Sequence, residues 1–471
     1  MVAVPGLSLT VQDGGLGVID LTGSEYSAKI GTCSSGTVNT VYSISTPAQA
    51  RSVLGYGPLA EACIYHIRSS GKPLYAVRAT GGTAGTASAV TQTGSGPAVT
   101  VAGAPRDSYQ VIVEVTGGGI LGAATMKYTL DNGDTYTPDI VIPAGGTYAL
   151  GETGLTLTFA AGTYVVGATY AITCTEPRAT LGNLGDAWDA LRADRTKVWR
   201  FVHVVGGGAD ASASAGIVGQ MDTDLAAAAL ERRYVHAVCE AADVTTALLI
   251  TAFAAVTSKR VGLCDGYCEL RQGDRAVMRR SIAWPYAARL AARPVSIDPA
   301  SLKGDEIPDP ALLGVVSITK DASSDASGNN ANFTTLRTHL GLPGYYVTNG
   351  LTLAPPGSDY QLIQYREIMD LACSTAAGRL LGYLSSRLQV DPATGRIATR
   401  SAIAIDADMS EALREALVRR GHAASASFAV DRTANILSTQ TFTGEVRITP
   451  PGYAKTITTT LTLVNPALTE A

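Results

Sequence analysis

The chain has 471 residues, of which 46% are hydrophobic and 16% are charged. This composition excludes a disordered chain, because there is ample apolar surface to bury and little charge repulsion. The formal net charge of −4, from 36 basic and 40 acidic residues, argues against a protein built to hold nucleic acid.

The sequence gives no sign of export or membrane insertion. Residues 1–6 lack a basic region followed by an apolar core, and the most apolar stretch, residues 244–256, is too short to cross a bilayer. The seven cysteines are scattered, with no histidine at ligand spacing. We therefore expect a soluble protein with buried free thiols, made in a reducing cytoplasm.

The predicted elements begin with an N-terminal arm, residues 1–25, which is Gly-rich and almost uncharged. Its short alternating run consists of Leu7, Leu9 and Val11. The apolar spacing of residues 48–68 predicts a helix, and residues 74–77 form a strand candidate. We assign residues 26–80 to the first part of a core domain.

Short β-strands follow. Between residues 101 and 175 apolar side chains recur with a period of two, and Asn132-Gly133 separates two such runs. Asn-Gly in this setting is a strong hairpin signal, because a type I′ turn needs a positive φ at both residues. The pattern predicts an all-β sandwich domain at residues 81–178, inserted into the core.

From residue 181 predicted helices and strands alternate. The predicted strands are residues 198–205, 234–238 and 260–264, and the predicted helices between them are residues 222–233 and 244–257. This alternation predicts an α/β core, a sheet layered with helices. Its second part is residues 179–452, and residues 453–471 form a C-terminal arm.

Two long helices are predicted late in the chain. Ser358 and Gln361 have the spacing of a capping box, which predicts a helix over residues 358–388. Its exposed polar positions are expected to include Arg366, Asp370, Arg379 and Arg387. A second helix is expected from Asp408 to Gly421, with acidic residues at its start and basic residues at its end. Residues 456–464 are β-branched and uncharged, which is typical of a strand.

Two clusters invite a chemical interpretation. Residues 206–211 match Gly-x-Gly-x-x-Ala after a predicted strand, but a dinucleotide site needs a helix to begin at once. Residues 212–215 are expected to be flexible, so a tight turn is favoured. Six arginines between residues 271 and 293 are interspersed with Glu269 and Asp274, which favours a subunit interface or a solvated helix face over nucleic-acid contact. These arginines are Arg271, Arg275, Arg279, Arg280, Arg289 and Arg293.

We identify no catalytic constellation. The five histidines include no pair at metal-ligand spacing, and His203 and His236 lie in apolar strands as expected core residues. Helix capping accounts for the paired carboxylates Asp222/Asp224 and Asp406/Asp408. The sequence therefore predicts no enzyme, no cofactor and no metal site.

A resemblance to a known family is carried by the C-terminal third of the chain. An extended segment, residues 340–350, ends in Asn349-Gly350 and is followed by Ser358-Asp359-Tyr360 and a helix with Arg366. This pattern resembles the contractile tail sheath proteins of bacteriophages and the sheaths of related contractile injection systems. Gly395-Arg396-Ile397, the acidic-capped helix and the terminal β segment are similar to that family's C-terminal half.

The resemblance implies a structural virion protein, assembled in the cytoplasm of the host bacterium. Such subunits form hexameric rings stacked helically around a tail tube, and contraction drives the tube through the bacterial envelope. The implied partners are other copies of the chain, the tail tube protein, and baseplate and tail terminator proteins, with no nucleic acid and no direct membrane insertion.

The resemblance also implies site residues. Terminal arms would exchange strands between subunits through Leu7, Leu9, Val11, Ile457, Leu461 and Leu463. The candidates for facing the tube or an interface are Arg366, Asp370, Arg379 and Arg387. Two alternatives stay open: an NAD-binding oxidoreductase that uses the strand and glycine loop at residues 198–211, and a receptor-binding or adhesin virion protein that acts through the sandwich.

Overall fold

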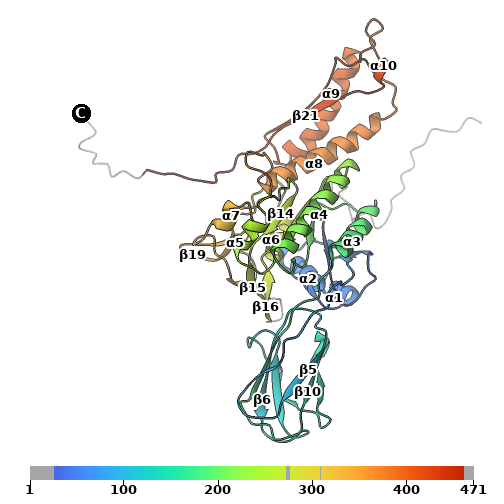
Figure 1. Cartoon of the computed structure of the whole chain (residues 1–471). Helices are drawn as coiled ribbons and strands as arrows, with labels where there is room; N and C mark the ends of the chain where they lie inside the picture. The colour runs from blue at the N-terminus through green and yellow to red at the C-terminus, as the bar shows by residue number, and fades with distance from the viewer. Residues whose placement is uncertain (1–25, 272–275, 308, 461–471) are drawn as a thin grey trace, which may run out of the picture. The chain divides into compact units, whose positions relative to one another are not determined.

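The computed structural model describes residues 26–271, 276–307 and 309–460 (Figure 1). The predicted arm residues Leu7, Leu9, Val11, Leu461 and Leu463 lie outside these ranges. The chain forms two compact units, Met1–Leu381 and Gly382–Ala471. Among the described helices, none is both long and apolar enough to pass through a bilayer.

The first unit is built on a six-stranded sheet with the strand order β14-β13-β12-β1-β3-β2. All neighbouring strands are parallel except β2, which runs antiparallel to β3. The strands are β1 (Ser27–Gly31), β2 (Val41–Ile44), β3 (Leu74–Arg78), β12 (Phe201–Val204), β13 (His236–Glu240) and β14 (Val261–Cys264). Every residue of β1, β12, β13 and β14 is buried, as expected for parallel strands that are covered on both faces.

Helices cover the two faces of this sheet, and successive residues of a strand point to different faces. Ala76 of β3 joins a core with α1 (Pro47–Leu54), α2 (Pro58–Ser70) and α6 (Ala283–Ala292). Its neighbour Val77 joins a second core with α3 (Leu181–Ala193), α4 (Ala211–Leu230) and α5 (Thr246–Ala252). The α/β layering is therefore confirmed.

The helix predicted over residues 48–68 is in fact two helices. Gly55 and Gly57 separate α1 from α2 with φ values of 67° and 118°. A Cβ at Gly57 would lie 2.9 Å from the carbonyl oxygen of Arg106. Glycine is thus required at this break, and apolar periodicity alone does not reveal it.

Residues 91–173 form two antiparallel sheets, with the strand orders β5-β10-β9 and β4-β11-β6-β7-β8 (Figure 1). One hydrophobic core, which includes Val113, Leu157 and Tyr170, is shared by both sheets. The strands are β4 (Thr91–Thr93), β5 (Val99–Gly103), β6 (Gln110–Gly117), β7 (Thr125–Thr129), β8 (Ile140–Val141), β9 (Thr147–Ala149), β10 (Leu155–Phe159) and β11 (Thr169–Thr173), with the 3-10 turn η1 (Gly151–Thr153).

The segments that lead into and out of this two-sheet segment run side by side. Thr83 and Arg178 form an antiparallel bridge. The amide of Thr83 donates to the carbonyl of Arg178, and the amide of Arg178 donates back to Thr83, both at 2.9 Å. The core chain therefore leaves and returns at one place.

The rest of the first unit contains small antiparallel sheets and two helices. β15 pairs with both β16 and β17, and β18 pairs with β19. The elements are β15 (Tyr267–Arg271), β16 (Val277–Ser281), β17 (Val315–Ile318), α7 (Ser327–Asn330), β18 (Leu336–His339), β19 (Leu342–Val347) and α8 (Ile363–Leu380), followed by the 3-10 turn η2 (Leu381–Tyr383).

The helix predicted over residues 358–388 is shorter, because α8 begins at Ile363 and ends at Leu380. Two backbone hydrogen bonds hold the preceding residues in an extended loop: Thr352 to the carbonyl of Gln361 at 2.9 Å, and Ile363 to the carbonyl of Gly350 at 3.0 Å. The predicted capping box is wrong, because these backbone hydrogen bonds keep the residues before Ile363 extended and the helix starts after them.

The second unit packs α9 (Thr399–Leu413) and the π-helical turn η3 (Arg414–Val418) against a two-stranded antiparallel sheet. Its strands are β20 (Ser425–Val430) and β21 (Gly444–Thr449), with α10 (Ile436–Thr439) between them. The predicted helix start at Asp408 is wrong by nine residues, whereas Gly421 follows the helix end with a φ of 73°, as predicted. Asp408 accepts a hydrogen bond from the Tyr383 hydroxyl at 2.7 Å and caps no helix.

Candidate functional site

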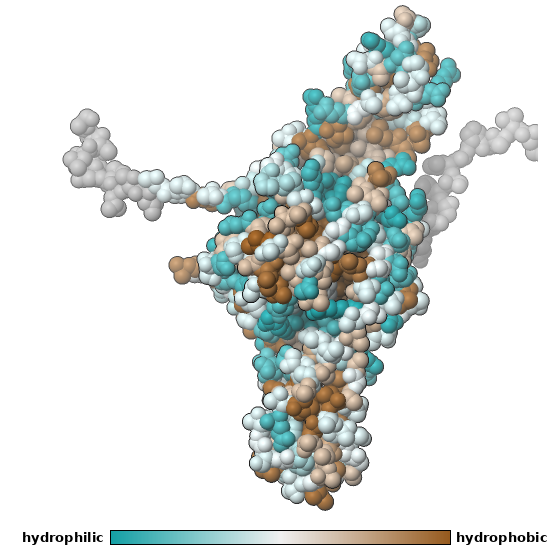
Figure 2. All heavy atoms as spheres, in the orientation of Figure 1, coloured by the Kyte–Doolittle hydropathy of each residue, from teal (hydrophilic) through white to brown (hydrophobic). Residues whose placement is uncertain are grey.

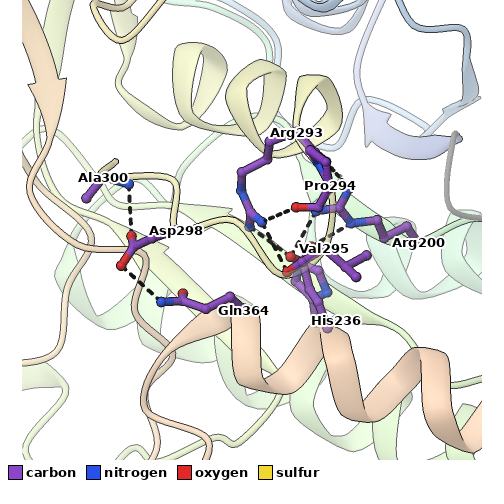
Figure 3. Close-up of polar contacts among 9 residues, drawn as sticks. Arg200, His236, Arg293, Pro294, Val295, Asp298, Ala300 and Gln364 are labelled. Atoms are coloured by element: carbon purple, nitrogen blue, oxygen red, sulfur yellow. Dashed lines mark hydrogen bonds and ion pairs between the residues drawn. The ribbon is translucent and has the colours of Figure 1, made fainter. Parts of the chain in front are cut away.

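The first half of α8 turns a charged face into the protein interior (Figure 3). Glu367 on α8 receives two hydrogen bonds from Arg200, from Nε at 2.7 Å and from Nη2 at 2.9 Å. Arg293, which follows α6, donates to the same carboxylate at 2.8 Å. His236 lies next to them, with Nε2 3.6 Å from the Glu367 carboxylate. All these side chains are buried.

Electrostatics fix the charge state of this cluster. Burial alone would raise the pKa of Glu367, but Arg200 and Arg293 hold it at about 2. Burial, with the nearby positive charges of both arginines, lowers the pKa of His236 to about 3. At neutral pH Glu367 is therefore ionised between two guanidinium groups, and His236 is neutral.

Two further contacts attach α8 to the same unit. Gln364 donates to Asp298 at 3.1 Å, and Asp298 also accepts the backbone amide of Ala300 at 2.9 Å (Figure 3). One turn beyond Glu367, Asp370 accepts from Arg366 at 2.6 Å and from Arg260 at 3.1 Å. The inner face of α8 is thus held by side chains from distant parts of the chain.

The predicted exposure of two α8 residues is wrong. Arg366 and Asp370 are each only 5% exposed: Arg366 pairs with Asp370, and Asp370 also pairs with Arg260. Arg379 is exposed near the end of α8, as predicted. Arg387 is also exposed, but it lies beyond α8, in the second unit.

Of the five described arginines of the six-arginine cluster, Arg280, Arg289 and Arg293 are buried, whereas Arg271 and Arg279 are exposed. Arg280 and Asp107 form an ion pair at 2.8 Å with both side chains only 2% exposed. Arg289 donates to the carbonyl of Pro310 at 2.5 Å, and Arg279 pairs with Asp243 at 2.7 Å. Arg275 lies outside the described residues. Arginine suits such buried pairs better than lysine does, because its planar guanidinium offers several donors to one carboxylate.

A second buried network joins three strands of the sheet. Lys29 of β1 contacts Nδ1 of His203 of β12 at 2.7 Å, and Nε2 of His203 lies 3.0 Å from Glu240 of β13. Trp284 donates to Glu240 at 2.9 Å. Burial lowers the pKa of Lys29 to about 8 and raises the pKa of Glu240 to about 7. His203 is thus the hydrogen-bonded core residue that its sequence context predicts.

The space around the glycine loop before α4 is occupied by neighbouring backbone atoms of the protein. The predicted flexible stretch is wrong, because α4 begins at Ala211 with Asp210 as its N-cap, which accepts from the Ala213 amide at 2.8 Å. A Cβ at Gly207 would lie 2.7 Å from the carbonyl oxygen of Ala241, and one at Gly208 2.4 Å from the Ser214 nitrogen. These glycines serve close packing, and the Asp210 carboxylate occupies the helix N-terminus that a phosphate would need. The dinucleotide alternative is disfavoured.

Of the predicted strand-exchange residues, only Ile457 belongs to the described part of the chain. Its side chain is 81% exposed, and residues 450–460 contain no strand. Within residues 382–460, β20 and β21 pair only with each other, so each has an open edge. No group of three or more potential ligands in the described ranges could hold a metal ion.

Comparisons with known proteins agree with this architecture. Residues 4–351 match the family described as DUF2586, N-terminal domain. No curated protein matches the chain. The contracted baseplate of the anti-feeding prophage (AFP) contains a similar chain, with a TM-score of 0.54 and 14% identity over 98% of this chain and 99% of that chain.

Two sheath structures give nearly the same result. The contracted helical sheath of AFP aligns with a TM-score of 0.53 and 12% identity over 98% of this chain and 99% of that chain. The contracted sheath complex of the extracellular contractile injection system PVC aligns with a TM-score of 0.53 and 10% identity over 98% of both chains. The chain therefore belongs to the DUF2586 family, and it has the fold of the contractile tail sheath proteins that its sequence resembles.

Proposed function

We propose that the chain is a sheath subunit, which polymerises as stacked hexameric rings around a tail tube and contracts to drive that tube through a bacterial envelope. The observation that carries this proposal is the likeness to the contracted AFP sheath, which extends over 98% of this chain and 99% of that one. Its partners would be the tail tube, baseplate and tail terminator proteins of a phage tail or injection system assembled in the bacterial cytoplasm.

Exposed apolar side chains support assembly. Figure 2 shows apolar residues gathered over α5, where Leu248 and Ile250 are 56% and 38% exposed. Leu340 and Leu342, at the turn between β18 and β19, are also exposed. Contiguous apolar surface of this kind marks protein contacts, and neighbouring copies would cover it.

The terminal arms would link the copies. Residues 1–25 and 453–471 are nearly uncharged and include the alternating apolar positions Leu7, Leu9, Val11, Leu461 and Leu463. We propose that they add strands to the open edges of β20 and β21 in a neighbouring copy, where backbone hydrogen bonds supply the affinity. Ile457, exposed in the isolated chain, would become buried there.

The other surfaces have separate roles in this proposal. Residues 81–178 form an inserted domain on the outer surface of the lattice, away from the core formed by residues 26–80 and 179–452. Arg379 and Arg387 are the exposed candidates for contact with the tube, whereas the buried Arg366 and Asp370 fix α8 in place.

Negative-stain electron microscopy of the purified chain tests the proposal, with and without a tail tube protein from the same source. Striated tubes or stacked rings with sixfold symmetry are expected. Particles that stay monomeric at high concentration and in the presence of the tube protein would contradict a sheath role. Binding of NAD by the dialysed protein would instead favour the oxidoreductase alternative.

A further inference from the structure

A cavity of about 370 Å³ opens between the starts of β12 and β13 and the second half of α8. Part of its wall is aromatic or apolar and includes Trp199, Tyr234 and Leu371. Its rim carries the cationic side chains of Arg195, Lys197, Arg232 and Arg233. The volume is in the range of small-molecule sites, and the proposed sheath contacts use none of these residues.

The carboxylates of this cavity are already neutralised by other side chains. Glu367 contacts both Arg200 and Arg293, and Asp370 contacts both Arg260 and Arg366. Each buried carboxylate therefore faces two guanidinium groups, which leaves a positive charge in each cluster. The third lining carboxylate, Glu231, contacts Arg192 at 3.5 Å. At the rim, Lys197 pairs with Asp194 at 2.5 Å, so the rim charges without a carboxylate partner among the described residues are those of Arg195 and Arg232.

The rim arginines have unused hydrogen-bond donors. Arg195 and Arg232 are exposed, and neither makes an ion pair or side-chain hydrogen bond with any described residue. Arg233 lies over the Trp199 ring, 4.2 Å from its centroid, and donates to the backbone carbonyls of Asp194 and Lys197. A guanidinium group whose N–H donors are unused can donate two parallel hydrogen bonds to the oxygens of one phosphate or carboxylate group.

The backbone at the rim supports a role for these side chains. Arg232 follows the end of α4 with a φ of 66°, a left-handed conformation that is usually taken by glycine where it follows a helix. A residue with a Cβ is disfavoured in this conformation, so the arginine is kept against a local preference. Strained residues of this kind gather at binding sites.

The floor of the cavity holds an unpartnered polar side chain. His236 is fully buried and, among the described residues, neither ring nitrogen has a hydrogen-bond partner; Nε2 lies 3.6 Å from the Glu367 carboxylate, and Nδ1 has no polar contact. A buried polar group without a partner is unusual in a folded protein. Because the imidazole is neutral, one of its nitrogens can donate a hydrogen bond to an acceptor in the cavity.

We propose that this cavity binds a small multivalent oxyanion, with at least two phosphate or carboxylate groups. One group would bind the guanidinium groups of Arg195 and Arg232 at the rim, and a second would accept the N–H of His236 at the floor. The carbon body or bridging atoms between them would lie against Trp199. The site does not depend on the proposed sheath function.

Isothermal titration calorimetry of the full chain tests the proposal, with pyrophosphate and citrate as probes at an ionic strength held constant with sodium chloride. We expect saturable binding of one anion per chain. The double variant Arg195→Gln/Arg232→Gln should bind about tenfold more weakly, because two charge-assisted contacts are lost. Its circular dichroism and ligand-free melting temperature should equal those of the wild type, since both side chains are exposed.

Arg400→Gln is the matched control, since Arg400 is an exposed arginine on α9 in the second unit. Binding of pyrophosphate alone would identify a phosphate ligand, and binding of citrate alone a carboxylate ligand. The proposal is overturned if neither anion gives saturable heat. It is also overturned if the double variant binds as tightly as the wild type, or if Arg400→Gln weakens binding as much as the double variant does.

Discussion

Glu367 shows how single side chains hold α8 in place. Its carboxylate is fully buried, yet it keeps its charge because Arg200 donates two hydrogen bonds and Arg293 one. Removal of one partner from a buried ion cluster leaves the others uncompensated, which typically costs 3–5 kcal/mol. The three residues are separated by 167 and 74 positions along the chain, so the cluster ties together parts that fold far apart in sequence.

Glu367→Gln is expected to lower the free energy of unfolding by about 3 kcal/mol at pH 7. The pKa of Glu367 is about 2 in the folded chain against an ordinary value of 4.5, so its contribution is complete above pH 4.5 and is lost as the pH falls towards 2. The difference between variant and wild type should therefore shrink below pH 4.5.

Urea unfolding at pH 7, 5 and 3.5 measures this difference. Asp139→Asn, at an exposed position in the two-sheet segment, should differ little from the wild type at every pH. A Glu367→Gln deficit that stays constant from pH 7 to pH 3.5 would show that Glu367 is not held ionised by the arginines.

Lys29 predicts an effect at the opposite end of the pH scale. Burial lowers its pKa from 10.5 to about 8, so the unfolded chain binds more protons than the folded chain between these values. Stability should rise with pH in that window. Relative to Lys29→Met, the wild type should gain about 2 kcal/mol between pH 8 and pH 10, measured by chemical denaturation.

The tyrosines and cysteines also contribute to the pH dependence of stability. Their contribution is the same in the wild type and in Lys29→Met, so it cancels in the comparison. Lys320→Met, at a partly exposed lysine that pairs with Asp265, serves as the control and should show no such gain. Parallel stability curves for the wild type and Lys29→Met from pH 8 to pH 10 would show that the pKa of Lys29 is not lowered by burial.

At the scale of elements, the sequence predicted those helices, strands and turns that are determined by residues close together in the chain. The alternation of helices and strands after residue 181 follows from apolar periodicity, and the turn at Asn132 and Gly133 has the two positive φ values that Asn-Gly favours. The burial of Arg366 and Asp370 was not predictable in this way. It depends on Arg260, which lies 110 positions from Asp370, and no spacing rule connects the two.

The C-terminal arm gives a test at this scale. Deletion of residues 456–464 should leave a folded, soluble chain that no longer polymerises, because the described residues 456–460 make no strand in the isolated chain. Circular dichroism reports the fold, and sedimentation with electron microscopy reports assembly. The control is a chain of unchanged length in which the sequence of residues 456–464 is scrambled. Long tubes formed by the truncated chain would contradict strand exchange.

Charge reversal tests the proposed contact with a tail tube. Arg379→Glu or Arg387→Glu should weaken co-sedimentation of the chain with tube protein at low salt, while circular dichroism and self-assembly stay unchanged. Exposed ion pairs contribute only about 0–1 kcal/mol each, so the effect should vanish at high salt. Arg400→Glu is the control, and equal tube binding by all three variants and the wild type would remove these residues from the tube interface.

At the scale of the whole molecule, the two-sheet segment contributes nearly all of one hydrophobic core, to which Met278 of β16 also belongs. It carries 3 basic and 7 acidic residues between positions 81 and 178. The way this segment is attached was not predictable from the sequence, since the buried pair of Asp107 with Arg280 joins residues 173 positions apart.

Replacement of residues 84–175 by a short Gly/Ser linker should preserve assembly, provided that Arg280→Met is added. Without that substitution the linker variant keeps a buried arginine whose carboxylate partner is gone, and it should be destabilised by about 3–5 kcal/mol. Thermal unfolding of the linker variant with and without Arg280→Met measures this difference, and electron microscopy measures tube formation. A folded linker variant with Arg280→Met that forms no tubes would place the segment inside the lattice contacts.

The bridge between Thr83 and Arg178 has an evolutionary consequence. Because the chain departs from the core and comes back through two hydrogen-bonded neighbours, a deletion of everything between them needs only one turn to close. Recombination can therefore replace the segment between Thr83 and Arg178 as one piece without changing the sequence of the core. Related chains should differ in length mainly at this position, and a foreign domain whose ends lie equally close together could be grafted there for display.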